Sequence, residues 1–464
     1  MASTAPQFAD WLDAGQVDRL SRSLGDSEGE RAARERAFRA FRDLPLEPNP
    51  LYRKYGYAAG VDLHGLDPGA GGSPVLVPPV SEDSILIVHD ASGTRAMVPE
   101  ALLEAGVRLE TYPSSSAQDR PALLEGPAQA SAPVDRLAAL SDALTNRGYA
   151  LTLPPHLAEP VQLHDVSMLS VPHEAISVHR RIALGAGSRL AATEEVYSAH
   201  HPAGHQRWFS SQVDLDLGLH AQALFLTVHA ADPDAVGYFG RHAELGERSR
   251  LNWTWTGFGG FRTRVRNATT LRGTGADVED LQTFFGDGEQ SFDSAVDLTH
   301  VGTDTHGQSI TRGVFRDRAR GMSRGLVRIE KDARRTVSYL SEHAMLLSRG
   351  ARSDTIPILE ILCRDVKATH STSVAPVDPE KVFYLESRGF PETDAVRMIG
   401  EGFLSYVLSR SPVEGLRELL YPLLSQRWEG VRSPFRTPGL GQLPDLNVSS
   451  TPGVTDWRFD SKLR

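Results

Sequence analysis

The sequence predicts a mainly β protein in which a parallel β-solenoid lies between an N-terminal helical and mixed region and a C-terminal helical domain. Three observations predict this fold. Residues 28–42 have the composition of a helix, residues 149–370 consist of short alternating runs separated by turns, and residues 378–424 return to helical spacing. At 464 residues the chain exceeds the size at which one hydrophobic core keeps growing, so we expect at least two structural units.

The N-terminal region begins as helix and continues as loop. Residues 28–42 (EGERAARERAFRAFR) are rich in strong helix formers and end just before a proline-containing break at residues 44–48. The Gly/Pro-rich run LHGLDPGAGGSPVLVPP is typical of loop, and residues 84–89 (SILIVH) predict a short strand. Residues 114–133 are small and polar, which favours a linker or mobile surface loop.

The stretch from Tyr149 onward carries the pattern of a solenoid. Trp253 and Trp255 alternate with polar neighbours, which is the period of two of a β-strand. Glycine turns recur about every 30 residues, inside the range of repeat architectures. A β-sandwich also gives short strands with turns, but here no helical crossover interrupts the pattern, and stacking is how each coil of a solenoid buries its inner face. The recurrent glycines are Gly187, Gly218, Gly246 and Gly275.

Three helices are predicted after the solenoid. Asp378 supplies an N-cap, Pro379 takes the first helical position, and Gly389 ends that helix. Pro391 and Pro412 open two further helices whose apolar residues fall on one stripe. The domain boundaries that these patterns predict are 1–148, 149–376, 377–430 and 431–464, the last of them a Pro/Gly/Ser-rich disordered tail.

Composition and charge exclude several classes of protein. The net charge of -10 argues against nucleic acid as the main partner, because phosphate binding needs a positive face. We also expect no membrane partner, since no long uncharged apolar run occurs and the N-terminus lacks the pattern of a signal peptide. One cysteine, Cys363, excludes an internal disulfide framework and fits a reducing compartment, so the predicted location is the cytoplasm.

Motifs for catalysis are absent from the sequence. No GxxxxGK[ST] loop, HExxH, paired CxxC or nucleophile elbow occurs, so we expect the chain not to be an enzyme. Arg262, Arg264 and Arg266 share one face of a predicted strand, and we interpret them as a solvated face.

Two further features suggest metal chemistry but are weak. His200, His201 and His205 are spaced closely enough to meet at a metal, yet they lie in a Pro/Gly loop with no carboxylate or thiol nearby in sequence. Cys363 alone cannot hold an iron–sulfur cluster, which normally uses four ligands. We interpret this thiol as a small buried hydrophobic side chain.

Residues 346–402 carry the most specific signal. Several motifs follow one another there and resemble the C-terminal core of the SufB/SufD family, in which a small-Asp-Thr-x-Pro-x-Leu-Glu strand leads to a His-centred strand, an FYL-x-SRG helix and a helix ending in Gly-Phe. Residues 149–167 are similar to the start of the family's β-helix. The matching residues are Asp354-Thr355-Ile356-Pro357 with Leu359-Glu360, His370, Phe383-Tyr384-Leu385 with Ser387-Arg388-Gly389, and Gly402-Phe403.

The resemblance implies a right-handed parallel β-helix and a role in iron–sulfur cluster assembly. In this family a SufB-type and a SufD-type subunit pair through their β-helices, and the C-terminal helices each dock a SufC-type ABC ATPase. A cluster or iron is held only transiently at the subunit interface, so no cofactor is expected to stay bound to the chain alone. The partner-binding residues that the matched motifs imply are Phe383, Tyr384, Arg388, Phe390 and Phe403.

Within the family the chain resembles SufD-type members. SufB-type members commonly carry a cysteine at the position of Ala351, and His-Glu where this chain has His370-Ser371. The SufD-type histidine implicated at the shared interface matches His370, although the cysteine often found two residues earlier is Ala368 here. The resemblance therefore implies His370 as an iron or cluster-interface ligand, and a structural role for this histidine is the alternative.

Two other interpretations stay open. The first is a SufB-like or homodimeric scaffold that itself holds the cluster, against which the absence of a cysteine at Ala351 speaks. The second is a β-helix carbohydrate-active enzyme, which would work with carboxylates in a groove and would leave the C-terminal motifs unexplained. Its candidate carboxylates are Asp293 and Asp297 with Asp304 or Asp317.

Overall fold

The structure is a computed structural model of the 464-residue chain. It describes residues 11–47, 60–77, 81–113, 123–124, 135–199, 205–412 and 416–430. The predicted tail at 431–464, most of the predicted linker at 114–133, and His200 and His201 lie outside the described residues.

The N-terminal region combines helices with short strands. The predicted helix at 28–42 is confirmed as α2, which begins at a capping box between Ser27 and Glu30, and the predicted strand at 84–89 is confirmed as β1. The elements are α1 (Ala14–Leu24), α2 (Glu28–Asp43), β1 (Ile85–Asp90), β2 (Gly93–Met97), α3 (Glu100–Glu104), β3 (Arg108–Tyr112) and α4 (Arg136–Leu144).

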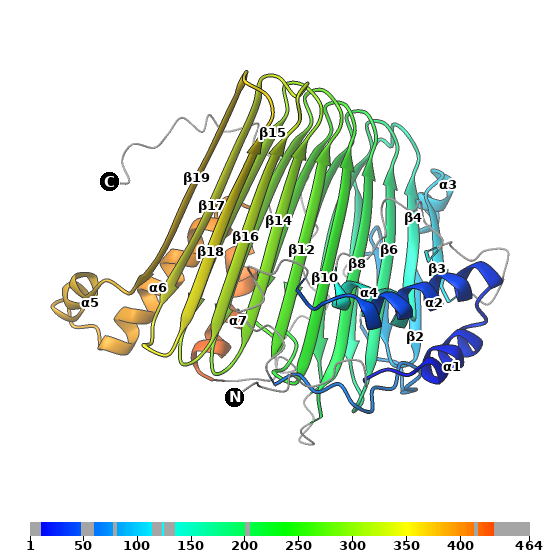
Figure 1. Ribbon diagram of the computed structural model, residues 1–464, viewed down its shortest axis with the longest axis horizontal. Coiled ribbons are helices and arrows are strands. Elements are labelled where there is room, and N and C mark those ends of the chain that lie inside the picture. The colour runs from blue at the N-terminus through cyan, green and yellow to red at the C-terminus, as the bar shows by residue number, and fades with distance from the viewer. Residues whose placement is uncertain are drawn as a thin grey trace.

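The core is a parallel β-solenoid, as predicted. Within the described residues, strands β4 to β19 alternate between two sheets, and each successive pair forms one of eight coils (Figure 1). The even-numbered strands from β4 to β18 with β3 form the even sheet, and the odd-numbered strands from β5 to β19 with β1 and β2 form the odd sheet. The strands are β4 (Arg147–Leu153), β5 (Val161–Leu169), β6 (Ala175–Leu184), β7 (Arg189–Ser198), β8 (Arg207–Leu217), β9 (Gln222–His229), β10 (Ala235–Leu245), β11 (Arg250–Gly257), β12 (Arg262–Leu271), β13 (Asp277–Gly286), β14 (Ser291–His300), β15 (His306–Phe315), β16 (Arg320–Ile329), β17 (Thr336–Leu346), β18 (Arg352–Ile361) and β19 (Val366–Pro376).

The four recurrent glycines all lie in the turn that follows an even strand, but at two different positions. At Gly218 and Gly246 the preceding coil approaches so closely that a Cβ has no room; on Gly246 it would lie 2.6 Å from the carbonyl oxygen of Leu217. Gly187 and Gly275 instead have φ values of +71° and +70°, a conformation that glycine adopts without strain. The repeat in the sequence therefore reflects both stacking and turn conformation.

The space between the two sheets, called the lumen below, is filled by side chains. A row of aromatic rings crosses the coils, with successive ring centroids 4.9 to 5.7 Å apart. Such contacts add about 0.5 to 1.5 kcal/mol per pair beyond the burial of the rings, so they help to hold one coil on the next. The row consists of Phe209, Phe239, Trp255, Phe284 and Phe292.

The N-terminal helices cover the outer face of the even sheet. Helix α4 contacts β6, β8 and β10, and α2 packs on α4 (Figure 1). Buried aromatic and aliphatic side chains join the helices to the strands, among them Phe38 and Phe41 of α2, Leu140 of α4, and Trp208 and Tyr238 of the sheet. The helices thus share a hydrophobic core with the solenoid.

The prediction that Arg262, Arg264 and Arg266 form a solvated face is wrong. They share one face of β12, but the segment after α2 and the start of α4 cover it, so that Arg262 and Arg264 are buried and Arg266 is mostly buried. Arg264 binds Asp293 (2.8 Å) and Asp135, the N-cap of α4 (2.9 Å). A sequence pattern identifies a basic face without revealing which distant segment will cover it.

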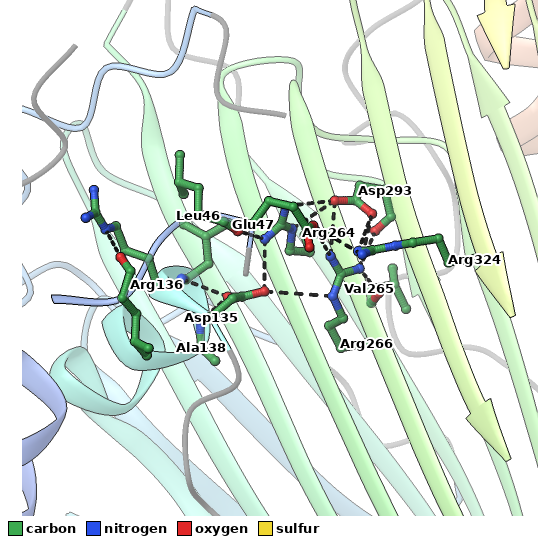
Figure 2. Close-up of polar contacts among 12 residues, drawn as sticks. Leu46, Glu47, Asp135, Arg136, Ala138, Arg264, Val265, Arg266, Asp293 and Arg324 are labelled. Atoms are coloured by element: carbon green, nitrogen blue, oxygen red, sulfur yellow. Dashed lines mark hydrogen bonds and ion pairs between the residues drawn. The ribbon is translucent and has the colours of Figure 1, made fainter. Parts of the chain in front are cut away.

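Arg264 and Arg266 belong to a balanced ionic cluster of three cations and three carboxylates (Figure 2). Arg324 completes it by binding Glu47 (3.2 Å) and Asp293 (3.3 Å). Burial alone would raise the pKa of Asp293, but Arg266, Arg264 and Arg324 outweigh burial and hold that pKa well below its usual range. The cluster fastens the N-terminal region to the even sheet.

The three predicted C-terminal helices are α5 (Pro379–Glu386), α6 (Glu392–Leu408) and α7 (Leu416–Trp428). Helix α6 lies on the outer face of the odd sheet against β13 and β15, whereas α5 projects past the end of the solenoid (Figure 1). Arg316 donates to the last carbonyls of α7, those of Arg427 (2.8 Å) and Trp428 (3.1 Å). The family motif predicted a helix that ends at Gly402-Phe403. This prediction is wrong, because α6 continues to Leu408.

Candidate functional site

The two sheets of the solenoid stop abruptly after the eighth coil. Strand β18 pairs only with β16, and β19 pairs only with β17, so each has one edge without a neighbouring strand among the described residues. Both edges are long, since β18 has 10 residues and β19 has 11. Three apolar side chains near this end are exposed: Ile361, Leu362 and Val374. Unprotected edges of this length are templates for pairing with another strand.

His370 lies at this open end, in the middle of β19. It is in register with Leu340, which belongs to the apolar cluster of the lumen, and Ala368 on the same face also packs against that cluster. The imidazole therefore lies on the lumenal face of β19, and it is exposed because none of the described residues forms a ninth coil over it. The neighbouring Ser371 faces outward, where its hydroxyl contacts Tyr339 Oη (2.8 Å) and His343 Nε2 (3.2 Å).

A second ionisable group lies one coil beneath His370 and was not singled out from the sequence. Glu342 of β17 is in register with Thr372 and is almost completely buried. Burial raises the pKa of this carboxyl group to about 7, and the hydrogen bond from Ser323 offsets only part of that effect. The only sequence signal was a glutamate at a lumenal position of an alternating strand.

The residues matched to the FYL-x-SRG motif form an exposed aromatic patch on α5 and the turn after it. Phe383 is 71% exposed, and Tyr384 and Phe390 are also exposed. The guanidinium of Arg388 lies 4.9 Å from the centre of the Tyr384 ring. We call Phe383, Tyr384, Arg388 and Phe390 the α5 patch. Large exposed aromatic side chains that gather on one short helix are typical of a protein-binding surface.

Phe403 differs from the α5 patch. It is half-buried on α6, packs against the apolar cluster between the C-terminal helices and the odd sheet, and stacks under the guanidinium of Arg312 (4.6 Å). Its position suits a residue that supports the surface from beneath rather than one that contacts a partner directly.

The two alanines that stand where the resemblance leads one to expect a cysteine, Ala351 and Ala368, are both near the open end. Ala351 is buried against Phe315 and Ala344 in the turn before β18, and Ala368 lies on the lumenal face of β19. Cys363 is buried among Val327, Ile329 and Leu340, in agreement with a role as a small hydrophobic side chain. Cys363 thus lies in the turn between β18 and β19 of the last coil, with its thiol largely buried.

The other sequence candidates do not assemble into a site. Asp304 precedes and Asp317 follows β15, so they lie at opposite ends of one strand, and Asp293 is neutralised by arginines. His205 is exposed and stacks on His173, with ring centroids 4.1 Å apart. In the part of the chain that the structure covers, no group of three or more His, Cys, Asp or Glu side chains is arranged to bind a metal. None of the described helices combines the length and apolar character needed to cross a membrane.

Comparison with a family model gives a match over residues 168–403, half of the chain, to the SufBD core domain of SUF system FeS cluster assembly. The match covers most of the solenoid, α5 and the first part of α6, and therefore both the open end and the α5 patch.

Individual proteins that are similar to this chain are also named as iron–sulfur cluster assembly proteins. The chain is 28% identical over 293 residues to the iron–sulfur cluster assembly protein SufD of Bacillus subtilis, which covers 63% of this chain and 67% of that protein. It is 26% identical over 362 residues to an iron–sulfur cluster assembly SufBD family protein of Mycobacterium bovis, covering 75% of this chain and 87% of the relative. A second such protein of that organism matches at 27% over 210 residues, which span only 25% of its length.

Proposed function

Because the chain belongs to the SufBD family of iron–sulfur cluster assembly proteins, we propose that it is the SufD-like, non-catalytic subunit of a cytoplasmic Suf complex. In this proposal it pairs with a SufB-type subunit through the open end of the solenoid and docks a SufC-type ABC ATPase through the α5 patch. Iron or a nascent cluster is the cargo at the shared interface, where His370 offers an imidazole ligand.

The main observation that supports the proposal is that β18 and β19 each have an edge without a neighbouring strand among the described residues. A partner strand added to each edge would continue both sheets, gain main-chain hydrogen bonds and cover Ile361, Leu362 and Val374. The same contact would close the lumen over His370, so a ligand from this chain would face ligands from the partner. Sequence similarity to the SufD of Bacillus subtilis and the absence of a cysteine at Ala351 support the SufD-like role over that of a scaffold that holds the cluster alone.

The pairing is tested by making the open end unsuitable for a partner. Full-length chain carrying Ile361→Lys and Val374→Lys is co-expressed with the SufB-type and SufC-type proteins of the same organism, and the mass of the purified complex is measured. We expect the double variant to lose the SufB-type subunit, because two buried, unpaired charges would oppose the contact. Leu219→Lys, at an equally exposed apolar residue in a turn far from the open end, is the control.

Two results would contradict this pairing. A double variant that retains the SufB-type subunit would move the interface away from the open end. A wild-type chain that purifies as a homodimer, with no SufB-type subunit bound, would favour the homodimeric scaffold.

Docking of the ATPase is tested separately on the α5 patch. Phe383→Ala should weaken retention of the SufC-type protein in a pull-down while leaving the SufB-type subunit bound. Leu103→Ala, at an exposed leucine of α3 at the opposite end of the solenoid, should change neither. Equal loss of the ATPase from both variants would argue against the α5 patch as the docking surface.

A further inference from the structure

Arg312 is a partly buried arginine at the junction between the odd sheet and helix α6. It lies on β15, and its guanidinium carbon is 4.6 Å from the ring centres of both Phe403 and Tyr406 of α6. Aromatic faces attract a cation, but they do not take the place of the oxygen acceptors that its five N–H groups can bind. The hydrogen-bonding capacity of Arg312 is therefore left unused by these contacts.

No carboxylate within the described residues pairs with Arg312. Its Nε is buried without a hydrogen-bond partner, and none of the described residues accepts a hydrogen bond from the other two nitrogens. Burial lowers the pKa of the guanidinium, and the hydroxyl groups of Tyr406 and Tyr339 offset only part of that effect. A cation that is partly withdrawn from water without a counterion is costly, so an anion brought to this position would be stabilised.

Two other arginines at the same junction do have carboxylates of this chain. Arg316, just after β15, binds Asp287 (3.2 Å) and the last carbonyls of α7. Arg410, just after α6, binds Glu279 of β13 (3.3 Å). These two charges help to hold the C-terminal helices on the sheet. Arg312 touches α6 through aromatic rings alone, so its charge is available to a group from outside the chain.

The surface beside Arg312 is polar and open. In the strand register Arg312 lies next to His343 of β17, which lies next to the exposed Ser373 of β19. The ring nitrogens of His343 contact the hydroxyls of Ser373 (2.5 Å) and Ser371 (3.2 Å), and burial together with the charge of Arg312 lowers the pKa of His343 to about 4. The imidazole is thus neutral at pH 7 and adds no second positive charge.

One planar cation with unused donors suits a carboxylate, which accepts two parallel hydrogen bonds from a guanidinium. A small free anion would meet only this one charged group, whereas a carboxylate carried by a docked protein is also held by the rest of its interface. Such an interface can reach Arg312 from the α5 patch. Helix α6 begins beside α5, and Phe403 and Tyr406 lie about 15 to 20 Å further along it, a span that an ordinary protein interface covers.

We propose that Arg312 anchors an acidic side chain of a partner protein docked on the C-terminal helices, through a carboxylate–guanidinium pair supported by Phe403 and Tyr406. The inference rests on the proposed function, under which this partner is the SufC-type ATPase, and it specifies a second contact besides the α5 patch. The partner's aspartate or glutamate supplies the counterion that the described residues do not. Because two charges meet at a partly exposed position, docking should weaken as the salt concentration rises.

The first test measures the affinity of the SufC-type ATPase for full-length wild type, Arg312→Gln and Arg312→Lys. Arg312→Gln should weaken binding about tenfold or more, and it should reduce the dependence of binding on salt. Arg312→Lys keeps the charge without the planar fork and should lie between the two. Arg328→Gln is the matched control, because Arg328 also faces outward from a strand but lies on the even sheet, where it binds Glu330 (2.6 Å) and Glu360 (3.1 Å).

Labelling of wild-type chain with phenylglyoxal, which modifies arginine side chains, gives a measurement that does not depend on how a variant folds. Peptide mass spectrometry should find Arg312 modified in the free chain and protected in the complex with the ATPase, and Arg328 modified equally in both. Equal affinity of wild type and Arg312→Gln, or equal modification of Arg312 in the free and bound chain, would overturn the anchor. Protection of Arg312 in the free chain by inorganic phosphate would also overturn it, by assigning the position to a small anion.

The outcomes separate this inference from the proposed function. If Phe383→Ala loses the ATPase while Arg312→Gln retains it with wild-type affinity, only the Arg312 anchor is refuted. If the wild-type chain does not bind the ATPase at all, the proposed docking is refuted, and the anchor is refuted with it.

Discussion

The sheets of the solenoid terminate differently at its two ends. At the N-terminal end the sheets terminate in antiparallel pairs, β1 with β2 and β4 with β3, and Val98 and Leu102 pack against the apolar cluster of the lumen. At the C-terminal end the described residues add no strand beyond β18 and β19 and leave His370 exposed. Folded proteins protect edges that are not meant to pair, so the contrast supports the proposed pairing at the C-terminal end.

The buried carboxylates of the lumen also differ between the two ends in whether they have counterions. Towards the N-terminal end, Asp165 and Glu194 share the guanidinium groups of Arg180 and Arg241, so both of these carboxylates have a counterion. Towards the open end Glu342 has only the hydroxyl of Ser323. Of these two lumenal glutamates, Glu194 is thus compensated by cations of its own chain, whereas the described residues supply none to Glu342.

The largest expected effect compares the two glutamates directly. Glu194→Gln leaves the buried Arg241 without an anion and should lower the free energy of unfolding by about 3 to 5 kcal/mol. Glu342→Gln removes a carboxyl group that has no cation and keeps an acceptor for Ser323, so it should change that free energy by less than about 1 kcal/mol. Urea denaturation at pH 7.5 measures both. Similar losses would mean that the lumen is equally complete at both ends.

The next effect concerns binding by the α5 patch. Arg388→Ala should weaken association with the ATPase subunit by about 1 to 3 kcal/mol, roughly ten- to a hundredfold, if the α5 patch is its anchor. Titration of the ATPase against wild-type and variant chains measures this. Arg39→Ala, an exposed arginine on α2 at the opposite end, should bind as wild type does. Unchanged affinity of Arg388→Ala would leave α5 with a purely structural role.

A smaller effect is a dependence of stability on pH that arises inside the lumen. Burial, together with the charge of Arg427, lowers the pKa of His229 to about 3, whereas an unfolded histidine titrates near 6.5. The unfolded chain therefore binds the proton first, and stability falls as pH drops from about 6.5 towards 3. When the pH falls from 7.5 to 5.5, this histidine should lower the free energy of unfolding by about 1.4 kcal/mol.

The check is urea denaturation of wild type and His229→Gln at these two pH values. The variant loses ring contacts with Phe239 and Trp255 and should be less stable throughout, but its loss on acidification should be smaller by that amount. His220→Gln, at an exposed histidine, should keep the wild-type slope. An unchanged slope in His229→Gln would mean that the lumen admits the proton without unfolding.

The sequence predicted the solenoid well because local chemistry determines it. Alternation at Trp253 and Trp255 correctly indicated a strand, which is β11. The glycine spacing reflected the close stacking of turns at Gly218 and Gly246 and the positive φ of Gly187 and Gly275. The caps at Asp378 and Ser27 similarly depend on neighbours within a few residues, and the helices that follow them lie close to their predicted bounds.

The features that the sequence did not predict depend on contacts between distant segments. Arg264 meets Asp135 across 129 residues, which no local pattern anticipates. Glu342 lies in an alternating strand as Glu194 does, and only the folded chain distinguishes a glutamate with two arginines from one with none. The resemblance suggested His370, but its place on the lumenal face of an unpaired edge required the strand register.

The smallest expected effect on stability belongs to His370. His370→Ala should change the free energy of unfolding by less than about 0.5 kcal/mol, because the imidazole is exposed at the end of the solenoid and no coil packs on it. In the assembled complex the same variant should lower the rate and yield of cluster formation, followed by absorption during anaerobic reconstitution. Thr369→Ala, on the outward face of the same strand, should form clusters as wild type does. A large loss of thermal stability in His370→Ala would instead make this histidine part of the fold, and the open end would then differ from the closed end in its edges alone.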